Sequence, residues 1–215
     1  DMDDSFTMVG SEFGRLFGGI GNDSFIMLDG ATLLGDIDGG GGDNTLDYRA
    51  YTTSVRVDLS TFTATGISRS IIGIGIVYGG EGDDHLTGDS GDNILASTGG
   101  SDILEGKYGS NTYLIYEGFN TVRIIETLIG RDTLDFSNVT SELMFRFNDK
   151  KVEKIAGGLI TGTVSYGKAS GEEVERGDRV KTFIGGSGNS HFIFKDGHVL
   201  SSDCMIDGGP GFRSE

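Results

Sequence analysis

Acidic and amide side chains recur at a fixed spacing in the middle of the chain, and their types and positions point to metal chemistry. Six successive units each carry Asp or Asn two residues after a glycine, and these residues are Asp84, Asn93, Asp102, Asn111, Asn120 and Asp132. Carboxylate and amide oxygens are hard ligands of the kind that Ca²⁺ prefers, and one Ca²⁺ takes about 6–8 of them. The spacing therefore indicates a divalent cation before any other ligand.

These residues belong to a nonapeptide repeat. The units occupy residues 79–87, 88–96, 97–105, 106–114 and 115–123, and a sixth follows at 127–135 after a three-residue slip. Every unit has Gly at its fourth position, Asp or Asn at its sixth and an apolar or aromatic residue at its eighth. Isolated copies lie at 18–26, 39–47 and 185–193. Agreement of three positions over six units indicates a repeat architecture.

The units resemble the G-G-x-G-x-D-x-U-x nonapeptide of the RTX, or haemolysin-type, calcium-binding repeat proteins. The resemblance covers residues 79–135 and the three isolated units, which is less than half of the chain. It implies a parallel β-roll that binds Ca²⁺ in its glycine-rich turns. It also implies a secreted or cell-surface location, with export by a type I route and folding driven by external calcium.

The spacing predicts which side chains meet. Glycine permits the tight turns, and two units make one coil of 18 residues. Successive coils stack as parallel strands about 4.8 Å apart. This stacking places Asp84 over Asp102 on one edge and Asn93 over Asn111 on the other. Two stacked carboxylates repel each other, so a bridging Ca²⁺ is expected on the Asp84/Asp102 edge first. The neighbouring acids of the asparagine edge are Asp89 and Asp92.

The expected calcium ligands combine turn side chains with backbone carbonyls. They are Asp84, Asp102, Asp83, Gly80, Gly82, Gly100, Asn93, Asn111, Asp92, Asp23 and Asp132. For Asp23 and Asp132, which lack a clean partner one coil away, metal binding and a simple turn role stand equally open. Asn44, Ser190 and Arg213 are interpreted as turn residues without metal. The alternative for every Asx residue is that it satisfies a turn, where Asp and Asn are common.

A longer repeat divides the chain. Residues 16–42 parallel 183–211, which indicates a tandem array in a longer protein. The predicted segments are 1–47 (the end of one block), 48–78 (strands), 79–135 (the calcium β-roll), 136–182 (a strand insert) and 183–215 (the start of the next block). Strands are also predicted at 55–59, 143–147 and 159–166 from alternation and β-branched residues. The fold class is all-β, a parallel β-roll or β-solenoid with flanking strand segments.

Composition excludes several classes of protein. The chain has 33 acidic and 17 basic residues, so its net charge of −16 opposes nucleic-acid binding. Its most apolar stretch, 71–78, is too short for a membrane span, which needs about 18 residues. A single Cys in 215 residues excludes a disulfide framework.

No catalytic motif appears in the sequence. It contains no H-E-x-x-H, no G-x-S-x-G and no P-loop lysine. We therefore expect a non-catalytic structural or adhesive segment whose partners are Ca²⁺ and the neighbouring repeats of the same chain. Two alternatives stay open, the accessory region of an extracellular enzyme and a carbohydrate-binding module. The second would bind extracellular glycans through Tyr48, Tyr51, Tyr78, Tyr108, Tyr113 and Tyr116.

Overall fold

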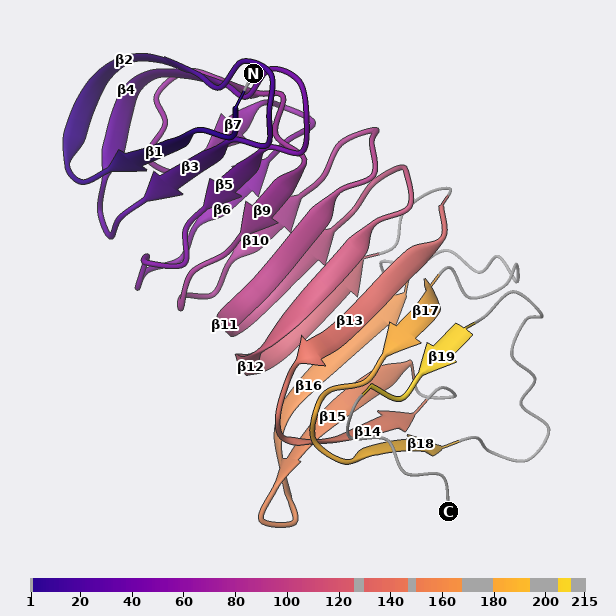
Figure 1. Cartoon of the computed structure of the whole chain (residues 1–215). Coiled ribbons are helices and arrows are strands. Elements are labelled where there is room, and N and C mark those ends of the chain that lie inside the picture. Colours follow the sequence, from indigo (N-terminus) through magenta and orange to yellow (C-terminus); the bar gives the residue numbers. More distant parts are fainter. Residues whose placement is uncertain (1, 126–129, 147–149, 168–179, 194–204, 210–215) are drawn as a thin grey trace.

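Short strands lying side by side form most of the molecule (Figure 1). The computed structural model describes residues 2–125, 130–146, 150–167, 180–193 and 205–209. No helix occurs among these residues, so the expected all-β class is confirmed. The same residues accordingly contain no helix long and apolar enough to cross a membrane. His198, Cys204 and Arg213 lie outside the described residues.

The strands are numbered in chain order. Those of the first half are β1 (Ser5–Met8), β2 (Ser11–Phe17), β3 (Ser24–Met27), β4 (Thr32–Asp38), β5 (Thr45–Asp47), β6 (Arg56–Asp58), β7 (Thr63–Ala64), β8 (Ile71–Ile72), β9 (Ile76–Tyr78) and β10 (His85–Thr87). Those of the second half are β11 (Ile94–Glu105), β12 (Thr112–Ile125), β13 (Asp132–Asn138), β14 (Glu142–Arg146), β15 (Lys151–Ala156), β16 (Leu159–Gly167), β17 (Val180–Ile184), β18 (Ser190–Ile193) and β19 (Met205–Asp207).

Most strands pair in parallel with a strand from a neighbouring layer. A 16-stranded sheet follows the order β1-β3-β5-β9-β11-β12-β16-β15-β14-β18, with β6, β7, β10, β13, β17 and β19 joined off this path. A separate three-stranded sheet has the order β2-β4-β8. The antiparallel pairs are β6 with β7 and the two pairs of β14–β15–β16. The chain thus forms a strand stack that begins at β1 and β2.

The register of the stack follows the nonapeptides. Leu86 lies opposite Leu104, and Leu95 lies opposite Tyr113, as predicted for units one coil apart. The three-residue slip then sets Tyr113 opposite Leu134. All these side chains are at most 1% exposed. Alternate residues of most strands therefore point into one continuous core that runs along the stack.

Two strands are longer than the repeat predicts. The unit at 79–87 ends in the expected three-residue strand, β10, whereas β11 and β12 run for 12 and 14 residues through expected turns. The two strands pair with each other over most of their length, with register shifts after Ser97 and after Gly100. Gly100 has a φ of 73°, and a Cβ there would lie 2.2 Å from the Gly82 carbonyl oxygen. Only glycine permits this approach of neighbouring layers.

The predicted strands outside the nonapeptides are also present. Residues 55–59 contain β6, residues 143–147 overlap β14, and residues 159–166 lie in β16. β15 and β16 form a hairpin that enters the sheet between β12 and β14. Lys154 of this hairpin is 8% exposed and donates to the carbonyls of Glu117 and Phe119 at 2.6 and 2.8 Å. These bonds stabilise the buried ammonium group against the middle of β12.

Leu104→Ala should destabilise the chain by about 2–5 kcal/mol, because Leu104 is fully buried and truncation leaves a cavity. Leu159→Ala is the matched control, since Leu159 is 71% exposed, and it should change the free energy of unfolding by less than about 0.5 kcal/mol. Urea denaturation measures both values. Equal effects of the two substitutions would contradict the inward position of Leu104.

Candidate metal centre

Two aspartates lie one above the other just before β10 and within β11. The Asp84 N–H donates to Asp102 Oδ1 at 2.8 Å, and the Val55 N–H donates to Asp84 Oδ1 at 2.8 Å. Asp84 and Asp102 are each 2% exposed. We call this pair the aspartate column. The predicted superposition of the two residues is confirmed, and each carboxylate faces the backbone of the preceding layer.

A second column runs along the opposite edge. The Asn93 N–H donates to Asn111 Oδ1 at 3.0 Å, and the Asn111 N–H donates to Asp132 Oδ1 at 2.8 Å. We call this the asparagine column. It continues toward the start of the stack through Gly75, which has no side chain and whose backbone bonds Asn44 on one side and Ile94 on the other.

Asp23 and Asp132 are both members of the asparagine column, so the prediction that they lack partners is wrong. The Asp23 N–H donates to Asn44 Oδ1 at 2.8 Å, and Asp23 Oδ1 accepts from the Asp4 N–H at 2.7 Å. Asp132 lies 21 residues after Asn111 because of the three-residue slip, and the register of β12 with β13 still brings the two residues together. This edge therefore carries buried acids as well as amides.

Most column side chains pack against the first glycine of their own unit. A Cβ on Gly79 would lie 2.4 Å from Asp84 Oδ2, and a Cβ on Gly88 would lie 2.4 Å from Asn93 Oδ1. The first glycine is thus needed because the sixth side chain occupies the space of its Cβ. The unit at 97–105 has Ser97 at this position, and the Ser97 hydroxyl donates to Asp102 Oδ2. Sequence reasoning missed Ser97, although the missing glycine marks it.

Burial opposes the charge of the aspartate column. Burial, together with the nearby carboxylates of Asp84 and Asp83, raises the pKa of Asp102 to about 7, although the hydrogen bonds from Ser97 and the Asp84 N–H lower it. The pKa of Asp84 is also raised, mainly by burial. A cation placed between these carboxylates would favour their charged forms.

The other predicted ligands are divided between the two columns. Asp83 and Asp92 are exposed, and they accept the N–H groups of Ser101 at 2.8 Å and Ser110 at 2.7 Å. Gly80 donates its N–H to Asp84 Oδ2 at 2.7 Å, and its carbonyl accepts from the Thr98 hydroxyl at 2.8 Å. Asp83 and Gly80 therefore bring carboxylate and carbonyl oxygens to the edge of the aspartate column, whereas Asp92 lies beside the asparagine column.

The residues of this edge offer oxygen ligands, and they fit a cation that binds both carboxylates and backbone carbonyls. Each carboxylate oxygen has two lone pairs, so an oxygen that accepts one hydrogen bond can still coordinate a metal. The described residues contain no group of three or more His, Cys, Asp or Glu side chains placed to hold one ion. A cation in the aspartate column would therefore depend on backbone carbonyls. An all-oxygen set of this kind suits Ca²⁺ and does not suit Zn²⁺.

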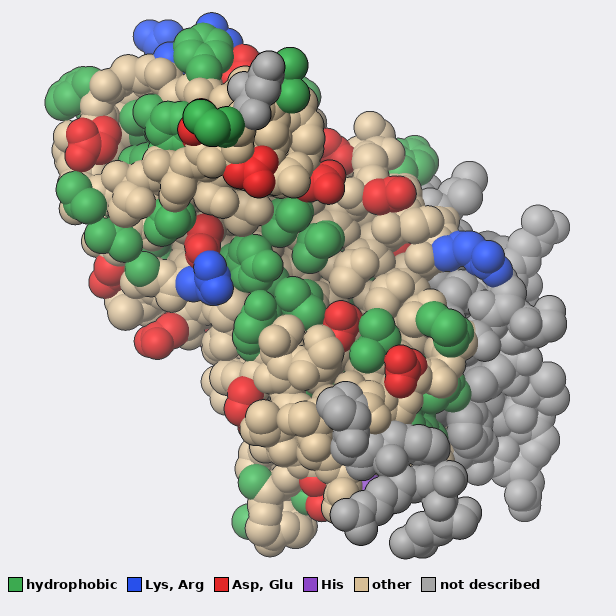
Figure 2. All heavy atoms as spheres, viewed as in Figure 1, with side chains coloured by type: hydrophobic (Ala, Val, Ile, Leu, Met, Phe, Trp, Pro, Cys, Tyr) green, Lys and Arg blue, Asp and Glu red, His purple; other side chains and the backbone are tan. Residues whose placement is uncertain are grey.

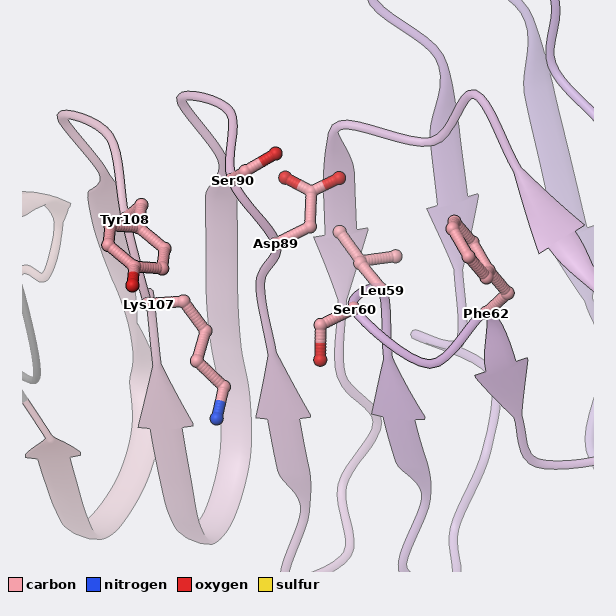
Figure 3. A pocket seen from close by; sticks show the side chains of 7 residues that line it. All are labelled: Leu59, Ser60, Phe62, Asp89, Ser90, Lys107 and Tyr108. Atoms are coloured by element: carbon pink, nitrogen blue, oxygen red, sulfur yellow. The ribbon is translucent and has the colours of Figure 1, made fainter.

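The tyrosines do not form the surface stripe considered for glycans. Tyr48, Tyr51 and Tyr113 are at most 4% exposed and belong to the core, whereas Tyr108 is 48% exposed. Tyr108 lines a surface pocket with the 50% exposed Phe62 (Figure 3). The pocket also contains Leu59, Ser60, Asp89, Ser90 and Lys107. In Figure 3, Asp89 lies between the two aromatic side chains.

Comparison with known proteins adds no assignment, because no protein-family model and no curated protein matches the chain.

In calcium-free solution, stability should fall as the pH rises from about 4 to about 7. Over this window folded Asp102, with a pKa of about 7, keeps a proton that it loses in the unfolded chain, where its pKa is 3.8. The expected slope is at most about 1.4 kcal/mol per pH unit. Asp102→Asn should remove this component, because the amide keeps the Oδ1 acceptor and carries no charge.

Urea denaturation in excess chelator at pH 5, 6, 7 and 8 measures the difference between the wild-type chain and Asp102→Asn. Asp92→Asn is the control, since Asp92 also accepts a backbone N–H from a neighbouring layer but is exposed. It should keep the wild-type slope. If the free energy of unfolding of Asp102→Asn had the same slope against pH as that of the wild-type chain, the raised pKa of Asp102 would be contradicted.

Proposed function

We propose that the chain is a non-catalytic, calcium-binding segment of a β-solenoid in an extracellular or cell-surface protein. One observation carries the proposal. Asp84 and Asp102 are stacked one layer apart, and both are buried. Their pKa values are raised mainly because burial disfavours the charged forms, and nearby carboxylates, Asp83 for Asp84 and Asp84 for Asp102, add to this effect. Such a pair stays charged at low cost only when a cation neutralises it.

Calcium is the cation that this edge favours. Ca²⁺ accepts mixed carboxylate and carbonyl ligands at irregular angles, whereas Mg²⁺ demands a tight octahedron and keeps its water. Extracellular calcium modules have dissociation constants of about 10⁻⁴–10⁻³ M, which matches a site with few charged ligands. Because the folded stack binds the ion and the unfolded chain does not, binding would stabilise the fold.

The solenoid part of the proposal rests on the register. Strands that follow the nonapeptides pair in parallel with strands 18 residues away. The same spacing joins Asp84 to Asp102 and Asn93 to Asn111 by hydrogen bonds. The neighbouring repeats of the same chain are then the main partners of each repeat. A role as a rigid structural or adhesive segment follows, since a continuous core runs along the stack.

Thermal unfolding followed by far-UV circular dichroism tests the dependence on calcium. Millimolar Ca²⁺ should raise the midpoint above its value in excess EGTA, whereas the same concentration of Mg²⁺ should raise it much less. Partial β-structure without calcium is expected in β14–β16, which carry no nonapeptide. Identical midpoints with Ca²⁺ and with EGTA would eliminate the calcium proposal.

Isothermal calorimetry on two variants tests the site. Asp102→Ala should weaken calcium binding at least tenfold, because it removes a charged ligand. Asn93→Ala, at the matched position of the asparagine column, should weaken it less than threefold. Asp102→Ala removes the acceptor of the Asp84 N–H and of the Ser97 hydroxyl, whereas Asn93→Ala removes the acceptor of the Asp89 N–H, so the stability of each variant is measured beside its affinity. Equal losses of affinity would show that the aspartate column is not the site.

The pocket beside Tyr108 favours carbohydrate binding as a second candidate function. Two exposed aromatic rings with carboxylate, hydroxyl and ammonium groups between them are groups that can stack on and hydrogen-bond a sugar. A glycan array with the wild-type chain and Tyr108→Ala tests it. Binding that Tyr108→Ala abolishes would support this function, and an array without bound glycans would contradict it.

A further inference from the structure

The first layer of the stack has open edges. β1 ends the large sheet and β2 ends the small one, so neither has an outer partner among the residues that the structure describes. Large apolar side chains are exposed at this end, among them Phe13 at 79% and Phe17 at 55%. Hydrophobic side chains are visible over the end that carries β1 and β2 in Figure 2. An open edge of this kind is a template for another strand.

The same arrangement occurs a second time in the chain, in covered form. β2 pairs with β4 so that Leu16 lies opposite Ile37, and β17 pairs with β19 so that Phe183 lies opposite Ile206. The sequence repeat aligns these two strand pairs residue by residue. β17 is therefore the counterpart of β2. Its outer edge is occupied by β13, with Leu134 opposite Phe183.

The pairing of β1 with β3 is repeated as well. Phe6 lies opposite Phe25 with ring centroids 5.0 Å apart, and Phe145 lies opposite Phe192 with centroids 4.6 Å apart, both stacked. β14 is thus the counterpart of β1, a relation that the sequence alone does not reveal. The outer edge of β14 is occupied by β15.

Burial separates the covered copy from the open one. Phe145 and Phe183 are 1% and 2% exposed, whereas their counterparts Phe6 and Leu16 are only partly buried. The open strands have the inward side chains of an internal layer without the layer that would cover them. Burying the rest of these side chains is favourable, at about 25 cal/mol per Å².

We propose that the outer edge of β2 is the docking site for a strand of the β13 type from another copy of this block, joined ahead of it in tandem. The strand would pair in parallel with β2 and set its counterpart of Leu134 over Leu16. Its counterpart of Asp135 would then lie opposite Phe17, on the face that carries Arg15. Arg15 now stacks over Phe17 at 4.3 Å and pairs with Asp38 at 3.3 Å, so its charge complements the incoming carboxylate. This proposal is independent of calcium.

A joined chain tests the proposal, with residues 1–141 followed directly by Asp3–Glu215. In the natural chain Ser141 precedes Glu142, and Glu142 is the counterpart of Asp3 because Phe145 is the counterpart of Phe6. The junction therefore keeps the natural spacing between β13 and the next block. Hydrogen exchange of the Ser11–Phe17 peptide, followed by mass spectrometry, reports on both copies of β2.

In the 215-residue chain this peptide should exchange as one fast population. In the joined chain it should split into two equal populations, one fast from the first copy and one slow from the covered second copy. The peptide that contains β17 should be slow in both chains and is the internal reference. A single fast population in the joined chain would overturn the proposal, whether the added copy folds or not, because β2 would then not order a β13-type strand.

Sedimentation of the 215-residue chain tests whether the β2 strand of a second molecule occupies the edge instead. If β2 instead pairs with the β2 of a second molecule, the chain sediments as a dimer and its Ser11–Phe17 peptide exchanges slowly. That result would also overturn the proposal. A monomer with a fast-exchanging β2 agrees with it.

Discussion

The buried backbone N–H at each turn is the constraint on which the stack depends. It lies where one layer meets the next, and a buried donor without a partner costs about 1–3 kcal/mol. A short Asx side chain of the neighbouring layer supplies the acceptor, as Asp102 does for Asp84 and Asn111 for Asn93. The side chain must point inward to do so, which leaves no space for a Cβ at positions such as Gly79. One hydrogen bond thus accounts for both the Asx and the glycine positions of the repeat.

Asp and Asn meet this constraint equally well, and they differ in charge. Both offer an Oδ1 acceptor of the same shape, so a scaffold alone would favour the neutral amide at a buried position. Burial, together with the Asp84 carboxylate one layer away, raises the pKa of Asp102 to about 7, which costs stability in neutral solution. Local choices that oppose stability are typical of functional sites, and this is why the aspartate column, and not the asparagine column, is the first candidate for metal.

The sequence predicts the periodic features well, because they depend on local spacing. The inward residues, the 18-residue register and the superposition of Asp84 on Asp102 follow from the nonapeptide alone. Long-range features do not follow from it. Asp132 joins the asparagine column because the chain absorbs three residues out of register, and β14 matches β1 although the two sequences share little beyond Phe145 and Phe6. These relations come from packing between layers, which sequence spacing does not encode.

The hairpin β15–β16 shows that the two edges of a layer can be extended independently. On one edge β13 pairs directly with β17, and on the other the hairpin lies between β12 and β14. The stacked pair Phe145–Phe192 nevertheless reproduces the pair Phe6–Phe25. The packing of a layer is therefore determined within that layer. The preceding layer needs only to supply strands of suitable register. A stack built in this way accepts insertions at its edges while its core continues along the stack.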